Sequence, residues 1–185
     1  MKQYIIIIGL VIIFGAIAGF AESSDNFTIT VTCNYIDFEL KTADNSAEYT
    51  DWPVGNVNEG ETVEMTTGAG GDHIYVENTS NVNLEFKAYS NSVAPGPCGY
   101  GTPVAWSPGG AAGLNTYYLR LGKGELGAVP GTYTDITGED LGGAILYYST
   151  IAGESYHLYT KLTAPNPADD GCSHTITVYI VAIAP

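Results

Sequence analysis

Residues 27–33, Phe-Thr-Ile-Thr-Val-Thr-Cys, alternate apolar side chains with threonine. Successive side chains of a strand point to opposite faces, so alternation among β-branched residues is typical of a half-buried β-strand. The apolar phase shifts by one position across residues 34–35 and continues through Ile36, Phe38 and Leu40. Such a shift predicts a bulge or a bend where a strand passes from one sheet to another.

The same period of two recurs in short segments bounded by Gly, Pro, Asn or Asp, and glycine makes up 23 of the 185 residues. This pattern predicts an all-β fold, a single antiparallel β-sandwich with jelly-roll or immunoglobulin-like connectivity. Residues 91–113 are the longest irregular segment, either an inter-sheet connection or a functional loop. Besides the N-terminal pair, we expect strands at residues 52–57, 61–67, 73–77, 83–89, 103–106, 116–121, 133–137, 144–148, 156–163 and 174–184.

The first 21 residues have the pattern of a secretory signal peptide. Lys2 precedes an apolar run over residues 4–18, and Gly19 and Ala21 are the small residues expected before cleavage at Glu22. A membrane anchor is the alternative, although the run is shorter than the about 20 residues of a spanning helix. We therefore expect residues 22–185 to form one β-sandwich domain outside the cell or on its surface, without a membrane span.

The expected mature chain is strongly acidic. It has 20 acidic residues and five of the six basic ones, a net charge of 5 − 20 = −15. Such a surface repels nucleic acid and anionic lipid, which disfavours both as partners. Natural sheets protect exposed edges with lysine and proline, so few basic residues predict weakly guarded edges. The basic residues are Lys41, Lys87, Arg120, Lys123 and Lys161.

Three cysteines leave one outside any intramolecular pair. Cys98 and Cys172 both lie in turn-rich segments, and we favour a disulfide between them over the other two pairings. Cys33 falls on the inward phase of its expected strand, which predicts a buried thiol, with an intermolecular disulfide as the alternative. Separately, Asn26 and Asn78 fit the acceptor pattern for N-glycosylation.

Residues 52–62, Trp-Pro-Val-Gly-Asn-Val-Asn-Glu-Gly-Glu-Thr, precede a strand-like segment, Ile-Tyr-Val-Glu-Asn-Thr-Ser-Asn-Val-Asn-Leu, at residues 74–84. This pattern resembles the opening of secreted bacterial and archaeal β-sandwich modules, among them fibre-forming proteins of the camelysin-like biofilm matrix type and archaeal bundling pilins. The resemblance covers about residues 27–89 and the last strand. It implies subunits that polymerise when an end strand of one completes a sheet of the next. The three cysteines and the Pro/Gly-rich loop depart from those families.

The sequence contains none of the catalytic motifs that we looked for around its histidines and carboxylates. His73, His157 and His174 lie in no metalloprotease or nucleophile-elbow motif, and we expect neither catalysis nor a cofactor. Paired carboxylates fit turns better than acid–base or metal chemistry. The less favoured alternative is a calcium site, formed by Asp135 with Glu139 and Asp140 or by Asp169 with Asp170.

The two end segments, residues 27–40 and 174–184, suggest assembly. Both are long and rich in β-formers, so either both complete sheets of their own domain or one pairs with a neighbouring subunit. We expect a structural subunit of an extracellular filament, pilus-like fibre or surface layer, with copies of itself as partners. The alternative is an adhesin or carbohydrate-binding module that uses outward tyrosines, Tyr100 or Trp106. The candidate assembly residues are Phe27, Ile29, Val31, Ile176, Val178, Ile180 and Ala182.

Overall fold

The computed structural model describes residues 30–31, 33–68, 70–138, 144–150 and 152–184. The expected signal peptide, Asn26, Phe27 and Ile29 lie outside the described residues. Contacts divide the chain into the units Met1–Cys33 and Asn34–Pro185, and the fold described here is that of the second unit. In the first unit, the described residues Thr30, Val31 and Cys33 are not in a strand.

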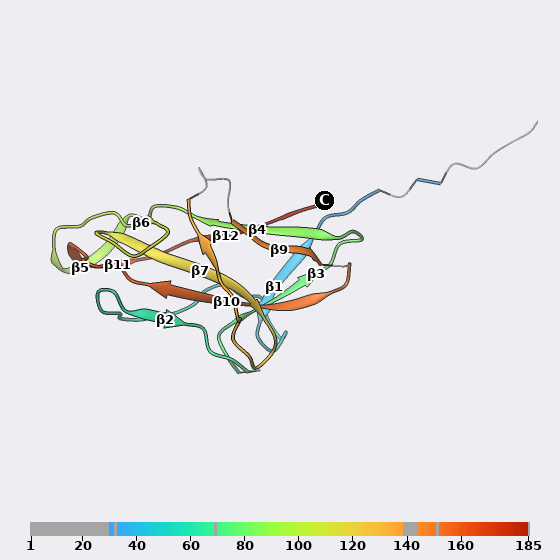
Figure 1. Ribbon diagram of the computed structural model, residues 1–185, viewed down its shortest axis with the longest axis horizontal. Coiled ribbons are helices and arrows are strands. Elements are labelled where there is room, and N and C mark those ends of the chain that lie inside the picture. The colour runs from blue at the N-terminus through green and yellow to red at the C-terminus, as the bar shows by residue number, and fades with distance from the viewer. Residues whose placement is uncertain (1–29, 32, 69, 139–143, 151, 185) are drawn as a thin grey trace, which may run out of the picture. The chain divides into compact units, whose positions relative to one another are not determined.

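All regular structure in the described part of the second unit is β-strand (Figure 1). The all-β prediction is therefore confirmed. The strands are β1 (Phe38–Thr42), β2 (Thr62–Glu64), β3 (Ile74–Asn78), β4 (Leu84–Ser90), β5 (Pro95–Gly101), β6 (Ser107–Pro108), β7 (Thr116–Gly124), β8 (Thr134–Ile136), β9 (Ala144–Thr150), β10 (Ser155–Thr163), β11 (Asp170–His174) and β12 (Val178–Ile183).

The strands form three hydrogen-bonded sheets. The largest has the order β1-β3-β10-β7-β6, with β2 also paired to β10 and β8 to β7. A second sheet has the order β12-β4-β9, and a third is the ribbon β11-β5. Pairing is antiparallel except between β6 and β7, which run parallel, so the expectation of purely antiparallel pairing is wrong at β6.

One hydrophobic core joins the largest sheet to the β12-β4-β9 sheet. On β4, alternate side chains are fully buried, with Phe86 at their centre. The ring of Phe86 meets Phe38 of β1 edge-on at 5.3 Å between centroids and Tyr156 of β10 at 5.6 Å. Burying an apolar side chain of this size stabilises a fold by roughly 1.5–3 kcal/mol, so these contacts hold the two sheets together.

Several segments differ from their expected structure. Residues 52–57 and 103–106 contain no strand, although Trp106 makes an isolated bridge. The indole of Trp52 instead donates a hydrogen bond to Asp72, and Gly55 has a φ of 78°, which is incompatible with a regular strand. Within the expected loop 91–113, residues 95–101 form β5. The expected strand 174–184 is interrupted at residues 175–177, between β11 and β12.

Candidate functional site

Strand β12 lies at one end of the β12-β4-β9 sheet. It pairs antiparallel with β4 along its whole length, from Val178 opposite Ser90 to Ile183 opposite Glu85 (Figure 1). Among the described residues, no strand pairs with its other side. The backbone N–H and C=O groups of an open strand edge can accept a further strand.

The inward face of β12 is only partly covered. Ile176, just before the strand, and Val178, Ile180 and Ala182 within it pack against the core but keep intermediate exposure. On the neighbouring strand β4, Phe86 is 0% exposed. The predicted assembly residues at this end of the chain therefore face inward, and they have apolar surface left to bury.

The outward face of β12 carries apolar side chains that were not among the predicted assembly residues. Tyr179, Val181 and Ile183 are 41%, 39% and 41% exposed. The unbroken apolar run from Tyr179 to Ile183 was the signal that could have identified them, because successive side chains of a strand point to opposite faces and these three lie opposite Ile180. Strand β12 contains neither a charged residue nor a proline.

The basic residues lie on other strands. Lys41 on β1 bonds Glu39 and Glu77, and its strand edge is partly covered because Tyr49 N–H donates to Leu40 O. Lys161 and Lys87 pair with Glu64 and Glu85 on the sheet surfaces, whereas Arg120 and Lys123 lie over tyrosine rings. The edge of β12 is thus left without the protection that lysine gives to exposed strands.

At the N-terminal end, Thr30, Val31 and Cys33 are the described residues of the expected strand 27–33. Val31 is 75% exposed and lies outside any strand. Cys33 is exposed, so its predicted burial is wrong. The chain passes into the second unit immediately afterwards, and the first strand of that unit starts only at Phe38.

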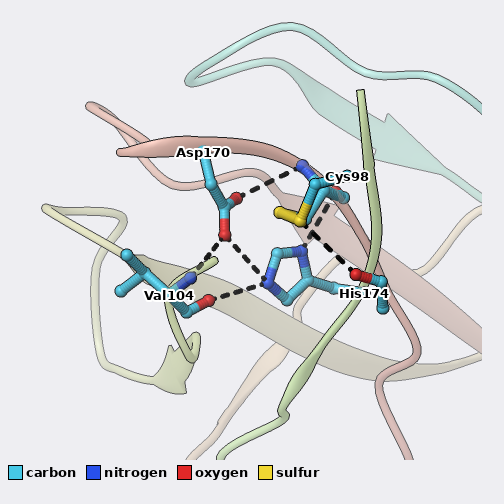
Figure 2. Close-up of a disulfide and its surroundings, with 6 residues drawn as sticks. Cys98, Val104, Asp170 and His174 are labelled. Atoms are coloured by element: carbon cyan, nitrogen blue, oxygen red, sulfur yellow. Dashed lines mark hydrogen bonds and ion pairs between the residues drawn. A yellow bond between two sulfur atoms is a disulfide. The ribbon is translucent and has the colours of Figure 1, made fainter. Parts of the chain in front are cut away.

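The predicted disulfide between Cys98 and Cys172 is formed (Figure 2). It joins β5 to β11, whose pairing is interrupted by two register shifts. A ribbon of two strands with an irregular ladder is marginal by itself, so the covalent link helps to hold this ribbon closed.

Beside the disulfide, His174 and Asp170 are almost completely buried, with side chains 1% and 0% exposed. Asp170 accepts a hydrogen bond from Val104 N–H, and the ring nitrogens of His174 lie 3.0 Å from Val104 O and 3.2 Å from Cys172 O (Figure 2). Trp106 stacks on the imidazole at 3.8 Å between centroids. These contacts tie the loop after β5 to β11.

The carboxylates of the predicted calcium sites are engaged in hydrogen bonds within the protein. Asp169 accepts a hydrogen bond from Asn115, and Asp135 accepts one from Tyr118, so these carboxylates already have protein partners. In the described ranges, no group of three or more His, Cys, Asp or Glu residues is arranged to hold a metal ion. Glu139 and Asp140 lie outside the described residues.

A pair of histidines links the residue before β3 to β10. Nε2 of His73, which is fully buried, lies 2.9 Å from Nδ1 of His157. Nδ1 of His73 is 3.0 Å from Thr66 O, which can only accept, so in the neutral ring Nδ1 donates to that carbonyl and Nε2 accepts the hydrogen bond from His157. Burial, and then the neighbouring His73, lower the pKa of His157 below its ordinary value. Sequence spacing gave no sign of this pair because 84 positions separate its members.

The predicted glycosylation of Asn78 does not fit the folded chain. Asn78 is fully buried at the end of β3. Its Nδ2 donates to Val82 O, and its Oδ1 accepts from the N–H and hydroxyl of Ser80. The amide nitrogen that would carry a glycan therefore belongs to a tight turn.

Comparisons with protein-family models, with curated proteins and with solved structures found no match. Among the residues described, no helix is long and apolar enough to cross a membrane.

Proposed function

We propose that this protein is a structural subunit of an extracellular filament, pilus-like fibre or surface layer, and that copies of it assemble through strand pairing at their ends. The observation that carries the proposal is the uncharged edge of β12, along which no other strand of the described residues pairs. A strand from a neighbouring copy would satisfy the unpaired backbone groups along that edge.

The segment Phe27–Val31 has the pattern that such a strand needs. Added beside β12 with Phe27, Ile29 and Val31 facing inward, it would cover the incompletely buried Ile180 and Ala182. Its threonines would then face water. Val31 is 75% exposed and lies in no strand, which supports a role for this segment outside its own domain.

The architecture and the disulfide support the rest of the proposal. Two sheets that share one core are consistent with a β-sandwich subunit, although β6 departs from purely antiparallel pairing. Disulfides form and persist in oxidising compartments, so the Cys98–Cys172 link agrees with an exported, cell-surface protein.

Electron microscopy and light scattering of the chain without residues 1–21 test this function. We expect filaments or arrays that grow with protein concentration. Ile29→Pro removes a backbone N–H and should leave monomers, whereas Ile29→Val keeps the β-preference and should assemble like the wild type. Isolated wild-type particles at high concentration would overturn the assembly function, and polymers that persist in Ile29→Pro would overturn strand donation.

One observation favours a carbohydrate-binding function as the second candidate. Tyr100 is 77% exposed on β5, and its ring lies against the backbone of Gly171, in the space that a side chain there would fill. A ring fixed on one face and exposed on the other can stack on a sugar. Trp106 is less suitable because its ring already stacks on His174. Binding on a glycan array that is lost in Tyr100→Ala and kept in Tyr100→Phe would favour this candidate.

A further inference from the structure

The outward side chains of β4 and β12 form one continuous patch. The antiparallel register places Tyr179 opposite Tyr89, Val181 opposite Lys87 and Ile183 opposite Glu85. On β4 the alternate residues Leu84, Phe86 and Ala88 fill the core, so their neighbours point away from it. We call these six residues the outer patch: Tyr89, Lys87, Glu85, Tyr179, Val181 and Ile183.

The outer patch is unusually apolar for an exposed sheet face. Antiparallel sheets with one face on the core normally present polar side chains to water, yet β12 presents Tyr179, Val181 and Ile183. The ring of Tyr179 also stacks on that of Tyr89, which makes a flat surface two strands wide. Contiguous apolar surface of this kind marks a contact site.

The charge of the patch favours a second copy of the chain as the partner. The chain as a whole has a formal net charge of −14, so most surfaces of two copies repel each other. The outer patch has only Lys87 and Glu85, which pair at 3.6 Å and sum to zero. A patch with one charge of each sign can also complement itself when two copies meet across a two-fold axis.

We propose that a second copy of this chain packs face to face on the outer patch. The inference rests on the proposed assembly function and adds to it a sheet-to-sheet contact that is distinct from pairing along the β12 edge. Six residues per copy form a contact below the size of stable interfaces. The face contact therefore acts together with strand pairing, which raises the local concentration of neighbouring patches.

A charge-matched pair of variants tests this contact. Val181→Lys places a charge in the outer patch, whereas Leu126→Lys places the same charge at another exposed apolar position, 53% exposed in the turn after β7. We expect Val181→Lys to raise the concentration needed for assembly by about tenfold, or about 1.4 kcal/mol, and Leu126→Lys to leave it unchanged. Circular dichroism and urea unfolding check that both variants fold. Equal assembly of the two variants would overturn the inference, whatever the result for Ile29→Pro.

Disulfide trapping detects the contact directly and separates the two proposals. In a Cys33→Ser background, Val181→Cys should give covalent dimers on mild oxidation, and Leu126→Cys should not. Dimers without polymers would support the face contact and count against the filament. Polymers without Val181→Cys dimers would overturn the face contact alone. Dimers that appear only after deletion of residues 22–31 would show that the chain's own N-terminal segment covers the patch, and would overturn the inference.

Discussion

Tyr179 on β12 and Tyr89 on β4 stand directly opposite each other, and their rings stack at 4.8 Å between centroids and 12° between planes. Cross-strand aromatic pairs stabilise a sheet beyond the area they bury. In this protein the stack fastens the edge strand to its neighbour on the face opposite the core.

Replacing Tyr179 by alanine should therefore lower the free energy of unfolding by about 1 kcal/mol. Tyr179→Phe keeps the ring and should retain most of that stability. Urea unfolding of dilute, monomeric protein measures both variants. A loss in Tyr179→Phe as large as that in Tyr179→Ala would show that the hydroxyl, rather than the stack, stabilises the strand.

The His73–His157 pair should make stability depend on pH. Burial and the adjacent His73 lower the pKa of His157 in the folded state, whereas the unfolded chain keeps the ordinary value of about 6.5. The unfolded chain then binds more protons as the pH falls through about 6.5, so folding free energy is lost on the acid side. A nearby carboxylate, Glu125, opposes part of this shift, and Tyr75 contacts the His157 ring edge-on.

Urea unfolding between pH 8 and pH 5.5 measures this dependence. We expect wild-type stability to fall toward pH 5.5 with a slope of at most about 1.4 kcal/mol per pH unit for one proton. His157→Gln should be flatter over the same interval. Carboxylates with lowered pKa, such as Asp72 and Glu64, act in a more acidic interval and do not mask the effect. Identical slopes for both proteins would contradict the assignment.

The disulfide between Cys98 and Cys172 should stabilise the folded protein against heat. Cys98 and Cys172 are separated by 74 positions, and closing a loop of that length stabilises a fold by up to about 4.5 kcal/mol in the chain-entropy model. Cys98→Ser should therefore lower the thermal midpoint strongly, as should reduction of the wild type. Cys33→Ser changes an exposed thiol outside the disulfide and should leave the midpoint unchanged. Equal midpoints for Cys98→Ser and Cys33→Ser would show that the link adds no stability.

Local alternation and turn chemistry were sufficient to predict much of the fold. Strands β3, β4, β7 and β10 lie close to their expected positions because their buried residues alternate regularly. Strand β5 was missed since its sequence, Pro-Gly-Pro-Cys-Gly-Tyr-Gly, has the composition of a loop. It is held by its partner β11 and the disulfide, a tertiary constraint that no local propensity expresses.

The candidate site was predicted only in part, for a related reason. The sequence indicated that residues 174–184 prefer β-structure, but not which side of that strand would lie open. The position of β12 at the end of its sheet follows from pairing with β4, about ninety residues earlier in the chain. The same limit applies to Asn78, whose acceptor pattern is local whereas its burial depends on how β3 packs.

The buried side chain of Asn78 should contribute to the stability of the fold. Asn78 bonds both Ser80 and the carbonyl of Val82, so Asn78→Ala leaves the buried N–H of Ser80 without its acceptor and removes one of the donors to Val82 O. The free energy of unfolding should fall by about 1–3 kcal/mol. Asn78→Asp should also destabilise the fold, because an ionised carboxylate cannot donate to Val82 O. Peptide mass spectrometry of protein from the source cells should find Asn78 unmodified, and a glycan on Asn78 would contradict the buried turn.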